Sequence, residues 1–337
     1  MQFNNIDMNL QQRIEIMTEL VSYMSPDNAE WADTVQKAFQ HNAWFIPEFT
    51  NTAVENIRME LLQTAALQNW AAHYHLDDNI TRKNVGLVMA GNIPLVGFHD
   101  FLCIFISGHR QTIKLSSKDD ILLAAIIARM HMMYPETLEL ISVSDMLVGC
   151  DAYIATGSNN SARYFEQYFA KYPHIIRKNK TSVGILSGQE TKEELEKLSD
   201  DIHLYFGLGC RNITKLFVPA GYDFIPLLSS FNKYLFFKDH HKYNNNYDYQ
   251  LSIMLLNNVY YMTNGSTLVV EAKPTFSPIS VLYYEFYRGM EDFLSQIPED
   301  DIQCRVGNGF LPFGQAQKPG LFSYADGVDT MAFLLTL

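Results

Sequence analysis

The chain has few cysteines, and they lack the spacing by which cysteines bind metals or build disulfide frameworks. Only Cys103, Cys150, Cys210 and Cys304 occur in 337 residues, and no two of them form a C-x-x-C pair. Structural zinc sites and disulfide-rich secreted domains need such close pairs. The sequence therefore predicts no metal centre, and it predicts reduced thiols and a cytoplasmic location.

Basic charge and long apolar runs are also scarce. The chain carries 25 Lys and Arg against 37 Asp and Glu, a net charge of −12, and no basic stripe, which argues against nucleic acid as a ligand. The longest uncharged stretch, residues 249–270, is interrupted by Gln250, Asn257 and Asn264. It predicts a buried helix and strand, so we expect no membrane span. The N-terminus has neither the basic start nor the apolar run of a signal peptide.

The pattern of apolar residues indicates an α/β fold with a helical N-terminus. Residues 1 to about 80 predict helices by their apolar spacing, and from residue 84 short apolar strands alternate with helices. The expected strands are 84–90, 111–116, 138–143, 152–156 and 181–186, and the expected helices 97–108, 118–134, 158–172 and 190–204. This alternation is typical of a mostly parallel, doubly wound sheet with helices on both faces. Ligands of such sheets bind beyond the carboxyl ends of the strands.

A second α/β unit follows near residue 187. Its expected elements are a strand at 213–218, a helix at 223–236, a polar loop at 238–249, a helix carrying Leu251, Met254, Leu255 and Met262, and strands at 267–272 and 280–286. We therefore expect two domains, 1–187 and 188–337. The aromatic stretch from Phe276 to Tyr287 is interpreted as strand core or a subunit contact, with the lining of an acyl channel as the alternative.

Two strand-to-helix turns have residues suited to binding phosphate. The turn at 90–100 contains Gly91, Asn92 and Gly97, and the turn at 155–165 contains Gly157 and Ser158. Helix N-termini present unpaired N–H groups and a partial positive charge, which favours pyrophosphate. Neither turn is a G-x-G-x-x-G motif, so an ordinary tight turn is the alternative for each.

A third turn, at 205–219, contains a candidate nucleophile. Cys210 lies there between glycines and close in sequence to Arg211 and Lys215. Adjacent positive charge or backbone N–H groups lower the pKa of a thiol and increase its nucleophilicity. A small buried apolar side chain is the alternative role for a cysteine.

In this order the segments resemble the acyl-CoA reductase family typified by the fatty acid reductase of bacterial bioluminescence, in the aldehyde dehydrogenase superfamily. The similarity runs from about residue 84 to the C-terminus. It is carried by GNIPLVGFHDFL (91–102), IKLSSKDD (113–120), ATGS (155–158), GLGCRNITKLFVP (207–219) and FGQAQKPGLFSYADGVDTMAFL (313–334). The resemblance implies an aldehyde-dehydrogenase-like fold, with a nicotinamide-cofactor domain in 1–187. It also implies a catalytic cysteine domain in 188–337, whose C-terminal tail packs back.

The resemblance also implies roles for individual residues. Cys210 matches the nucleophile, and Asn92 the asparagine that forms an oxyanion hole with the backbone N–H of the cysteine. Lys114 matches the lysine that contacts the adenine ribose, while Gly157 and Ser158 match the pair under the pyrophosphate. The expected activity is reduction of an acyl-CoA, with a fatty acyl group favoured, to an aldehyde through a Cys210 thioester, with CoA as the leaving group.

The sequence departs from the superfamily pattern in ways that refine this expectation. Hydrolytic members have a glutamate base just before the lysine that Lys180 matches, whereas residues 175–180 read IIRKNK. That absence disfavours water as the acyl acceptor. Ser117 stands where relatives often have an acidic residue that binds the ribose 2′-OH, and a serine does not repel a 2′-phosphate, so NADPH is favoured over NADH. Leu311 replaces a glutamate that contacts the nicotinamide ribose in relatives.

Several alternatives stay open at this point. His99 and His203 are candidate acid/base residues, although a structural role is favoured for both, as it is for Asp100 at the helix start. His240 and His241 have no third ligand at metal spacing. An acyl-phosphate reductase would use the same cysteine, and a non-reducing protein would pass the acyl group to a partner enzyme. A homo-oligomer is a further expectation, and the one least secured by the resemblance, because the chain is shorter than usual members.

Overall fold

The computed structural model describes residues 8–289 and 299–337, which divide into two units. The first unit holds the chain up to Asn179 together with Pro319–Leu337, and the second holds Lys180–Lys318. The expected boundary at 187 would leave the strand at 181–185 in the first sheet. That strand instead pairs with strands of the second unit, so the boundary lies before it.

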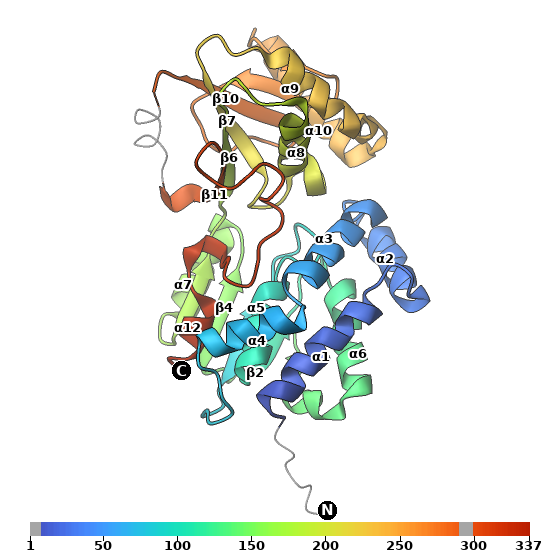
Figure 1. The fold of residues 1–337 in the computed structure, drawn as a ribbon, viewed down its shortest axis with the longest axis vertical. Helices are drawn as coiled ribbons and strands as arrows, with labels where there is room; N and C mark the ends of the chain where they lie inside the picture. The colour runs from blue at the N-terminus through green and yellow to red at the C-terminus, as the bar shows by residue number, and fades with distance from the viewer. Residues whose placement is uncertain (1–7, 290–298) are drawn as a thin grey trace, which may run out of the picture. The chain divides into compact units, whose positions relative to one another are not determined.

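The first unit begins with helices, as the apolar spacing predicts (Figure 1). They are α1 (Leu10–Tyr23), α2 (Ala29–His41), α3 (Pro47–Glu60) and α4 (Thr64–His73). Asn9 begins α1 with a capping box, because its side chain accepts from the Gln12 N–H while the Gln12 side chain accepts from the Asn9 N–H. Pro47 occupies the first position of α3, where its missing N–H costs no helical hydrogen bond.

A five-stranded parallel sheet with the order β3-β2-β1-β4-β5 is the centre of the first unit. Its strands are β1 (Asn84–Val88), β2 (Arg110–Lys114), β3 (Ile141–Val143), β4 (Ala152–Thr156) and β5 (His174–Arg177). The helices after the N-terminal four are α5 (Phe98–Ser107), α6 (Ile121–Met133), α7 (Asn159–Phe169) and α12 (Thr330–Leu334), with short 3-10 helices at Pro135–Glu139 and Ala325–Gly327. Sequence analysis missed β5, because HIIR is short and begins and ends with polar residues.

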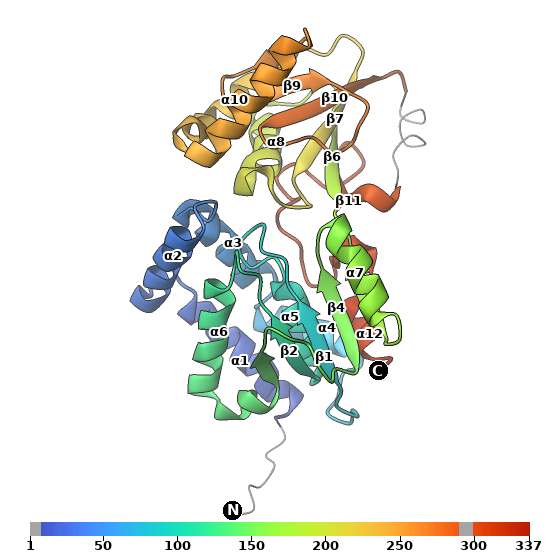
Figure 2. The same ribbon diagram turned by 180° about the vertical axis from the view of Figure 1, so that it is seen from behind.

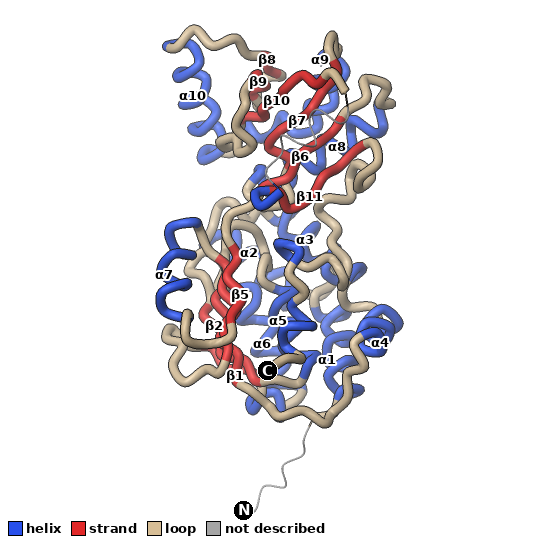
Figure 3. Tube along the Cα trace, turned by 90° about the vertical axis from the view of Figure 1, so that its left-hand side faces the viewer, coloured by secondary structure: helices blue, strands red, loops and turns tan. Residues whose placement is uncertain are grey.

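The two faces of this sheet are covered unequally. Val85, Leu87 and Ile113 belong to one large core with the side chains of α5 and α6, whereas α7 packs over β4 and β5 on the opposite side (Figure 3). Residues 144–151, which lead from β3 to β4, contain no helix. The expectation of helices on both faces therefore holds only for the β4–β5 side of the sheet.

Polar side chains line the less covered part of this sheet instead. Thr112 donates to the side-chain oxygen of Asn84 at 3.1 Å, and Ser142 donates to the Thr112 hydroxyl at 3.3 Å. Thr112 and Ser142 are register partners on β2 and β3, and Asn84 is two residues before Gly86, the partner of Thr112 on β1, so the three side chains lie on the same face. Figure 2 shows the sheet from behind, with α7 over β4. A polar ladder needs no apolar cover, which accounts for the missing helix.

The second unit contains a six-stranded sheet with the order β11-β6-β7-β10-β9-β8, in which only the β8–β9 pair is antiparallel among the described pairs. Its strands are β6 (Thr181–Ile185), β7 (Ile213–Pro219), β8 (Met262–Thr263), β9 (Leu268–Glu271), β10 (Val281–Tyr287) and β11 (Ile302–Gly307). Its helices are α8 (Lys192–His203), α9 (Phe224–Ser230) and α10 (His241–Leu256), with 3-10 helices at Leu204–Gly207, Phe231–Asp239 and Glu299–Asp301.

Helices cover both faces of the second sheet. Val269 belongs to the core that contains Leu198 of α8 and Leu227 of α9, while its neighbours Leu268 and Val270 pack in the core that contains Tyr247 of α10. Successive strand residues point to opposite faces, so the two cores lie on opposite sides of the sheet. The aromatic stretch ending at Tyr287 is largely β10, and Tyr284 is buried core, as the strand interpretation predicts.

The prediction of a loop at 238–249 is wrong. Most of this segment is the first half of α10, which His240 begins by accepting a hydrogen bond from the Tyr243 N–H at 3.2 Å. Tyr243, Tyr247 and Met254 are its buried residues and share one face, while the asparagines lie on exposed or half-buried faces. Composition alone suggested a loop, but spacing of the two tyrosines by four residues fits a helix. Met262 lies in β8 and not in that helix.

No helix within the described residues combines the length and the apolar character that crossing a membrane requires.

Candidate active site

Five of the predicted site residues gather at one edge of the first sheet. Val88 at the end of β1 is the register partner of Lys114 on β2 and of Ala155 on β4. Asn92, Ser117, Gly157 and Ser158 follow these strand ends directly in the chain, and Lys114 is the last residue of β2. The carboxyl ends of neighbouring parallel strands thus bring Asn92 and the predicted cofactor residues to the same edge, where such sheets bind ligands.

The turn after β1, which carries Asn92, is fixed by the turn after β2. Leu95 has a φ of 54°, a backbone conformation that is rare for a side chain of its kind, and its N–H donates to Asp119 at 2.7 Å. A Cβ at Gly91 would lie 2.4 Å from the Ser116 hydroxyl, so this position needs a glycine. Asn92 itself is half-buried.

Asp119 is a functional-site neighbour that sequence analysis missed. It is 8% exposed, and burial raises the pKa of its carboxyl to about 7. Only one of its oxygens accepts a hydrogen bond, from Leu95, while the other is buried without a partner among the described residues. Its position two residues after Ser117 was visible in the sequence, but its burial was not.

The turn after β4 has the features of a phosphate-binding turn. Ser158 caps α7 by accepting a hydrogen bond from the Ser161 N–H at 3.2 Å. A Cβ at Gly157 would lie 2.9 Å from the Cβ of Ser161 and 3.0 Å from the ring of Phe165. Gly157 therefore lets the strand end pass close to the helix, whose N-terminus carries a partial positive charge.

The loop with Ser117 is held by the end of α2. The His41 imidazole bonds to the Ser117 carbonyl oxygen at 2.9 Å, and Asn42 donates to the Lys118 carbonyl oxygen at 3.1 Å. Lys114, Ser117 and Lys118 have exposed side chains. The N-terminal helices thus support the loop that the sequence links to the cofactor ribose.

Cys210 lies in the second unit, in a turn between the 3-10 helix Leu204–Gly207 and β7, and is half-buried. Asn212 closes this turn, since its side-chain oxygen accepts from the Gly209 N–H at 2.8 Å and its N–H donates to the Gly209 carbonyl at 3.1 Å. Ser182 of β6 donates to the Cys210 carbonyl oxygen at 3.0 Å. Sequence analysis missed both Asn212 and Ser182, although Asn212 is only two residues after the cysteine.

Burial disfavours ionisation of the other three thiols. Burial raises the pKa of the Cys103 thiol well above its ordinary value, and burial also raises the pKa of the Cys150 and Cys304 thiols. For Cys304, the Ser182 hydroxyl and the neighbouring Arg211 oppose the effect of burial. Cys210 remains the candidate because of the turn that holds it, as its Gly-flanked position predicts.

Lys215, which is close to Cys210 in sequence, has other partners. It is 2% exposed on β7, and its ammonium group lies 2.5 Å from a Glu285 carboxylate oxygen and donates to the Lys273 carbonyl at 2.7 Å. Its charge is thus balanced within the sheet.

His203 lies in surroundings unsuited to proton transfer. It is 3% exposed among Phe231 and Tyr234, and burial lowers its pKa to about 4. Its two ring nitrogens bond to the Ser199 carbonyl at 2.8 Å and the Thr267 hydroxyl at 2.9 Å. The imidazole is neutral and fully engaged at pH 7, which favours the structural alternative.

His99 and Asp100, at the start of α5, hold the C-terminal segment. His99 bonds to the Leu321 carbonyl at 3.0 Å, and Asp100 pairs with Arg177. These contacts also favour structural roles for both residues.

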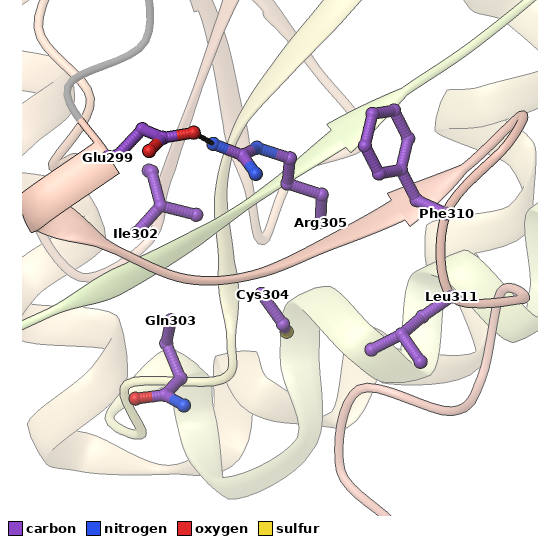
Figure 4. Close-up of a pocket in the computed structure, with 7 residues that line it drawn as sticks. All are labelled: Glu299, Ile302, Gln303, Cys304, Arg305, Phe310 and Leu311. Carbon is purple, nitrogen blue, oxygen red and sulfur yellow. Dashed lines mark ion pairs between the residues drawn. The ribbon is translucent and has the colours of Figure 1, made fainter. Parts of the chain in front are cut away.

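A pocket of about 410 Å³ lies along β11 in the second unit. Its lining residues are Glu299, Ile302, Gln303, Cys304, Arg305, Phe310 and Leu311 (Figure 4). Arg305 pairs with Glu299 at 3.5 Å, and the Cys304 sulfur lies 3.1 Å from the Ser182 hydroxyl that contacts the Cys210 turn. Leu311, which by the resemblance replaces a glutamate that contacts the nicotinamide ribose in relatives, lines this pocket.

Within residues 8–289 and 299–337, no group of three His, Cys, Asp or Glu side chains is placed to hold a metal ion. The cysteine turn and the three sheet-edge turns belong to different units, and each is described within its own unit.

The fold is similar to solved aldehyde dehydrogenase structures. Aldehyde dehydrogenase 21 of Physcomitrella patens, in complex with succinate, is 11% identical with a TM-score of 0.68, covering 90% of this chain and 74% of that one. The chain has the aldehyde dehydrogenase fold. A Mycobacterium tuberculosis aldehyde dehydrogenase complexed with NAD+ is 14% identical, with a TM-score of 0.61 and coverage of 91% and 75%.

A third solved structure of this fold is described as an Escherichia coli NADP dependent enzyme. It is 12% identical, with a TM-score of 0.61 and coverage of 88% of this chain and 73% of that one. No protein-family model and no curated protein sequence matches the chain. At such identities the similarity shows the aldehyde dehydrogenase fold alone, which agrees with the fold that the sequence resemblance implied.

Proposed function

We propose that this chain is an acyl-CoA reductase that uses NADPH to convert an acyl-CoA, with a fatty acyl group favoured, into an aldehyde and CoA. The observation that carries the proposal is the turn in which Asn212 and Ser182 hold a half-buried Cys210. Of the other cysteines, Cys103 and Cys150 are buried and Cys304 is half-buried, and burial raises the pKa of all three thiols. The aldehyde dehydrogenase fold and the absence of a carboxylate in residues 175–180 support it.

Cys210 would act by nucleophilic attack on the thioester carbonyl of the acyl-CoA. The new bond joins its sulfur to the carbonyl carbon, the bond to the CoA sulfur breaks, and CoA leaves as a thiolate that takes up a proton. We assign to the Asn92 side chain the donation of a hydrogen bond to the carbonyl oxygen as negative charge develops there. With no glutamate base before Lys180 to activate water, transfer to and from a thiol is favoured over hydrolysis.

A nicotinamide cofactor, when bound, supplies the hydride that reduces the acyl group on Cys210. The residues of the first unit fit such a cofactor. A Cβ at position 157 would collide with α7, so the backbone of Gly157 can lie close to the start of this helix. Ser158 begins that helix, which is long enough to present N–H groups to a pyrophosphate. Two of the relatives are described with NAD+ or NADP, which supports the cofactor class.

The loop after β2 supports a preference for NADPH. Ser117, Lys114 and Lys118 are its exposed side chains, whereas Asp119 is buried against Leu95. Asp120 lies 3.6 Å from the His41 imidazole. A 2′-phosphate would then meet two ammonium groups and a hydroxyl, and both kinds of group bind phosphate.

The test is to follow NADPH absorbance with an acyl-CoA and with an acyl phosphate, and to measure the intact mass of the protein after incubation with acyl-CoA alone. We expect NADPH oxidation with acyl-CoA and one acyl adduct, lost in Cys210→Ala. Oxidation with acyl phosphate only would identify an acyl-phosphate reductase instead. Acylation without any oxidation of NADPH or NADH would identify a protein that passes acyl groups to a partner, and an adduct on Cys210→Ala would overturn the role of Cys210.

A further inference from the structure

The end of α8 lies against the turn that carries Cys210. After His203 the chain reverses through three residues with left-handed backbone, Tyr205, Phe206 and Gly207, at φ values of 56°, 57° and 73°. The last carbonyls of a helix carry partial negative charge, and a helix C-terminus disfavours an anion such as a thiolate. The C-terminus of α8, which disfavours a thiolate, therefore precedes the proposed nucleophile by only a few residues.

Asn212 neutralises this helix end. Its side-chain nitrogen lies within hydrogen-bond distance of three carbonyl oxygens, those of Asp201 and Ile202 at 3.2 Å each and that of Leu204 at 2.9 Å. The basic residue of the last turn, His203, is neutral at pH 7 because burial lowers its pKa to about 4. The Asn212 side chain thus donates to carbonyls at the end of α8 and just after it.

The same side chain fixes the cysteine turn. The Asn212 side-chain oxygen accepts a hydrogen bond from the Gly209 N–H at 2.8 Å. The backbone carbonyl of Asn212 accepts one from the Ser182 N–H at 3.2 Å. Asn212 is fully buried, at 0% exposed. Its amide is therefore fully used, with the donor on the helix end and the acceptor on the residue before Cys210.

We infer that Asn212 is a positioning residue for Cys210. Its amide nitrogen donates hydrogen bonds to the carbonyls at the end of α8, which reduces their unfavourable effect on a thiolate in the cysteine turn. Its amide oxygen fixes the conformation of that turn, so that the Cys210 thiol ionises more readily. This inference rests on the proposed function only in taking Cys210 as the nucleophile. The ionisable groups around the turn are Asp200, Asp201 and His203 at the end of α8, Tyr205 in the 3-10 helix Leu204–Gly207, Arg211 in the turn and Cys304 on β11.

The experiment is the pH profile of Cys210 alkylation by iodoacetamide, measured by peptide mass in the full-length protein. Asn212→Asp keeps the size of the side chain and an acceptor but loses the amide donor, and it adds a negative charge where it ionises, so the uncharged Asn212→Ser decides the inference. We expect alkylation of Asn212→Asp at pH 7 to be about tenfold slower, with the midpoint about one pH unit higher. Asn212→Ser, which keeps one donor, should show a smaller displacement in the same direction.

Asn257→Asp is the matched control, because Asn257 donates its side-chain nitrogen to the Ile253 carbonyl at the end of α10 at 2.9 Å. It should leave the profile unchanged. Circular dichroism melting shows which variants fold. If Asn212→Asp does not fold, the pH profile of Asn212→Ser still decides the test. A wild-type profile in a folded Asn212 variant overturns the inference. Since the reagent is iodoacetamide, failure of acyl-CoA to acylate the wild type would refute the proposed function without affecting this test.

Discussion

Asp100 and Arg177 form a buried ion pair in which a carboxylate oxygen of Asp100 lies 2.6 Å from a guanidinium nitrogen of Arg177. The Thr330 hydroxyl joins them, 2.7 Å from the guanidinium and 3.2 Å from the carboxylate, and Arg177 also donates to the Ala325 carbonyl. The pair therefore links α5, β5 and the C-terminal segment.

Removing one partner of this pair should destabilise the first unit. Asp100→Ala leaves the guanidinium of Arg177, which is 2% exposed, without its counter-charge, and we expect a loss of about 3 kcal/mol in the free energy of unfolding. Urea unfolding measures it. The control is Glu166→Ala, which breaks an exposed pair with Lys178 and should cost much less stability. Equal losses of unfolding free energy in the two variants would show that the buried pair stabilises the unit no more than an exposed pair does.

Gly157→Ala should weaken binding of NADPH. The new Cβ would lie 2.9 Å from the Ser161 Cβ, so the turn against α7 must open and the helix N-terminus must shift. We expect the dissociation constant, measured by NADPH fluorescence, to rise by about tenfold. Gly320→Ala is the control, because its Cβ would meet nothing within 4 Å. Unchanged affinity in Gly157→Ala would exclude this turn as the pyrophosphate site.

Asn92→Ala tests the oxyanion donor. If the amide stabilises charge on the thioester oxygen, kcat should fall by about a hundredfold to a thousandfold. NADPH affinity should stay close to that of the wild type. The exposed Asn69 of α4 gives the control variant, Asn69→Ala, with expected normal turnover. A fall of less than about tenfold would remove Asn92 from the oxyanion hole.

Asp119 should make stability depend on pH. Burial raises the pKa of its carboxyl from 3.8 to about 7, so between these values the unfolded chain loses the proton that the folded protein keeps. This contribution to stability is full below pH 3.8 and is lost as pH rises toward 7. Asp119→Asn cannot ionise and should therefore gain stability relative to the wild type between pH 5 and pH 8.

Urea unfolding at several pH values measures this difference, with Asp120→Asn as the control at the neighbouring position. Burial also raises the pKa of Asp201 to about 7. The Asp119 variant should therefore keep part of the pH dependence of stability that the wild type shows. A stability difference between wild type and Asp119→Asn that does not vary with pH would contradict the shift.

Much of the first sheet could be predicted because its strands are short apolar runs between helices. The strand containing Leu87 and the helix containing Cys103 follow directly from such runs. The strand β11, with the sequence IQCRVG, was missed because its polar residues hide the alternation. The open face with Thr112 was missed because the sequence does not show which polar strand residues pair with one another.

The candidate site divides in the same way. Cys210, Gly157 and Ser158 follow from local sequence, since glycines and a helix start mark them. Asn212 and Asp119 act through burial and contacts with other elements, which local sequence does not contain. His203 has the spacing of an ordinary helix residue, and only its packing against Tyr234 shows that it is neutral.

The division of the chain has a consequence for how the protein is made. The first unit contains both the N-terminal helices and Pro319–Leu337, where Tyr324 accepts a hydrogen bond from Trp70 at 3.0 Å. Domains generally fold in the order of their synthesis. Here all of Lys180–Lys318 leaves the ribosome before the segment that completes the first unit. The unit that begins first is therefore completed after the second one, and until Pro319–Leu337 has been translated the apolar surface around Trp70 stays without its final cover.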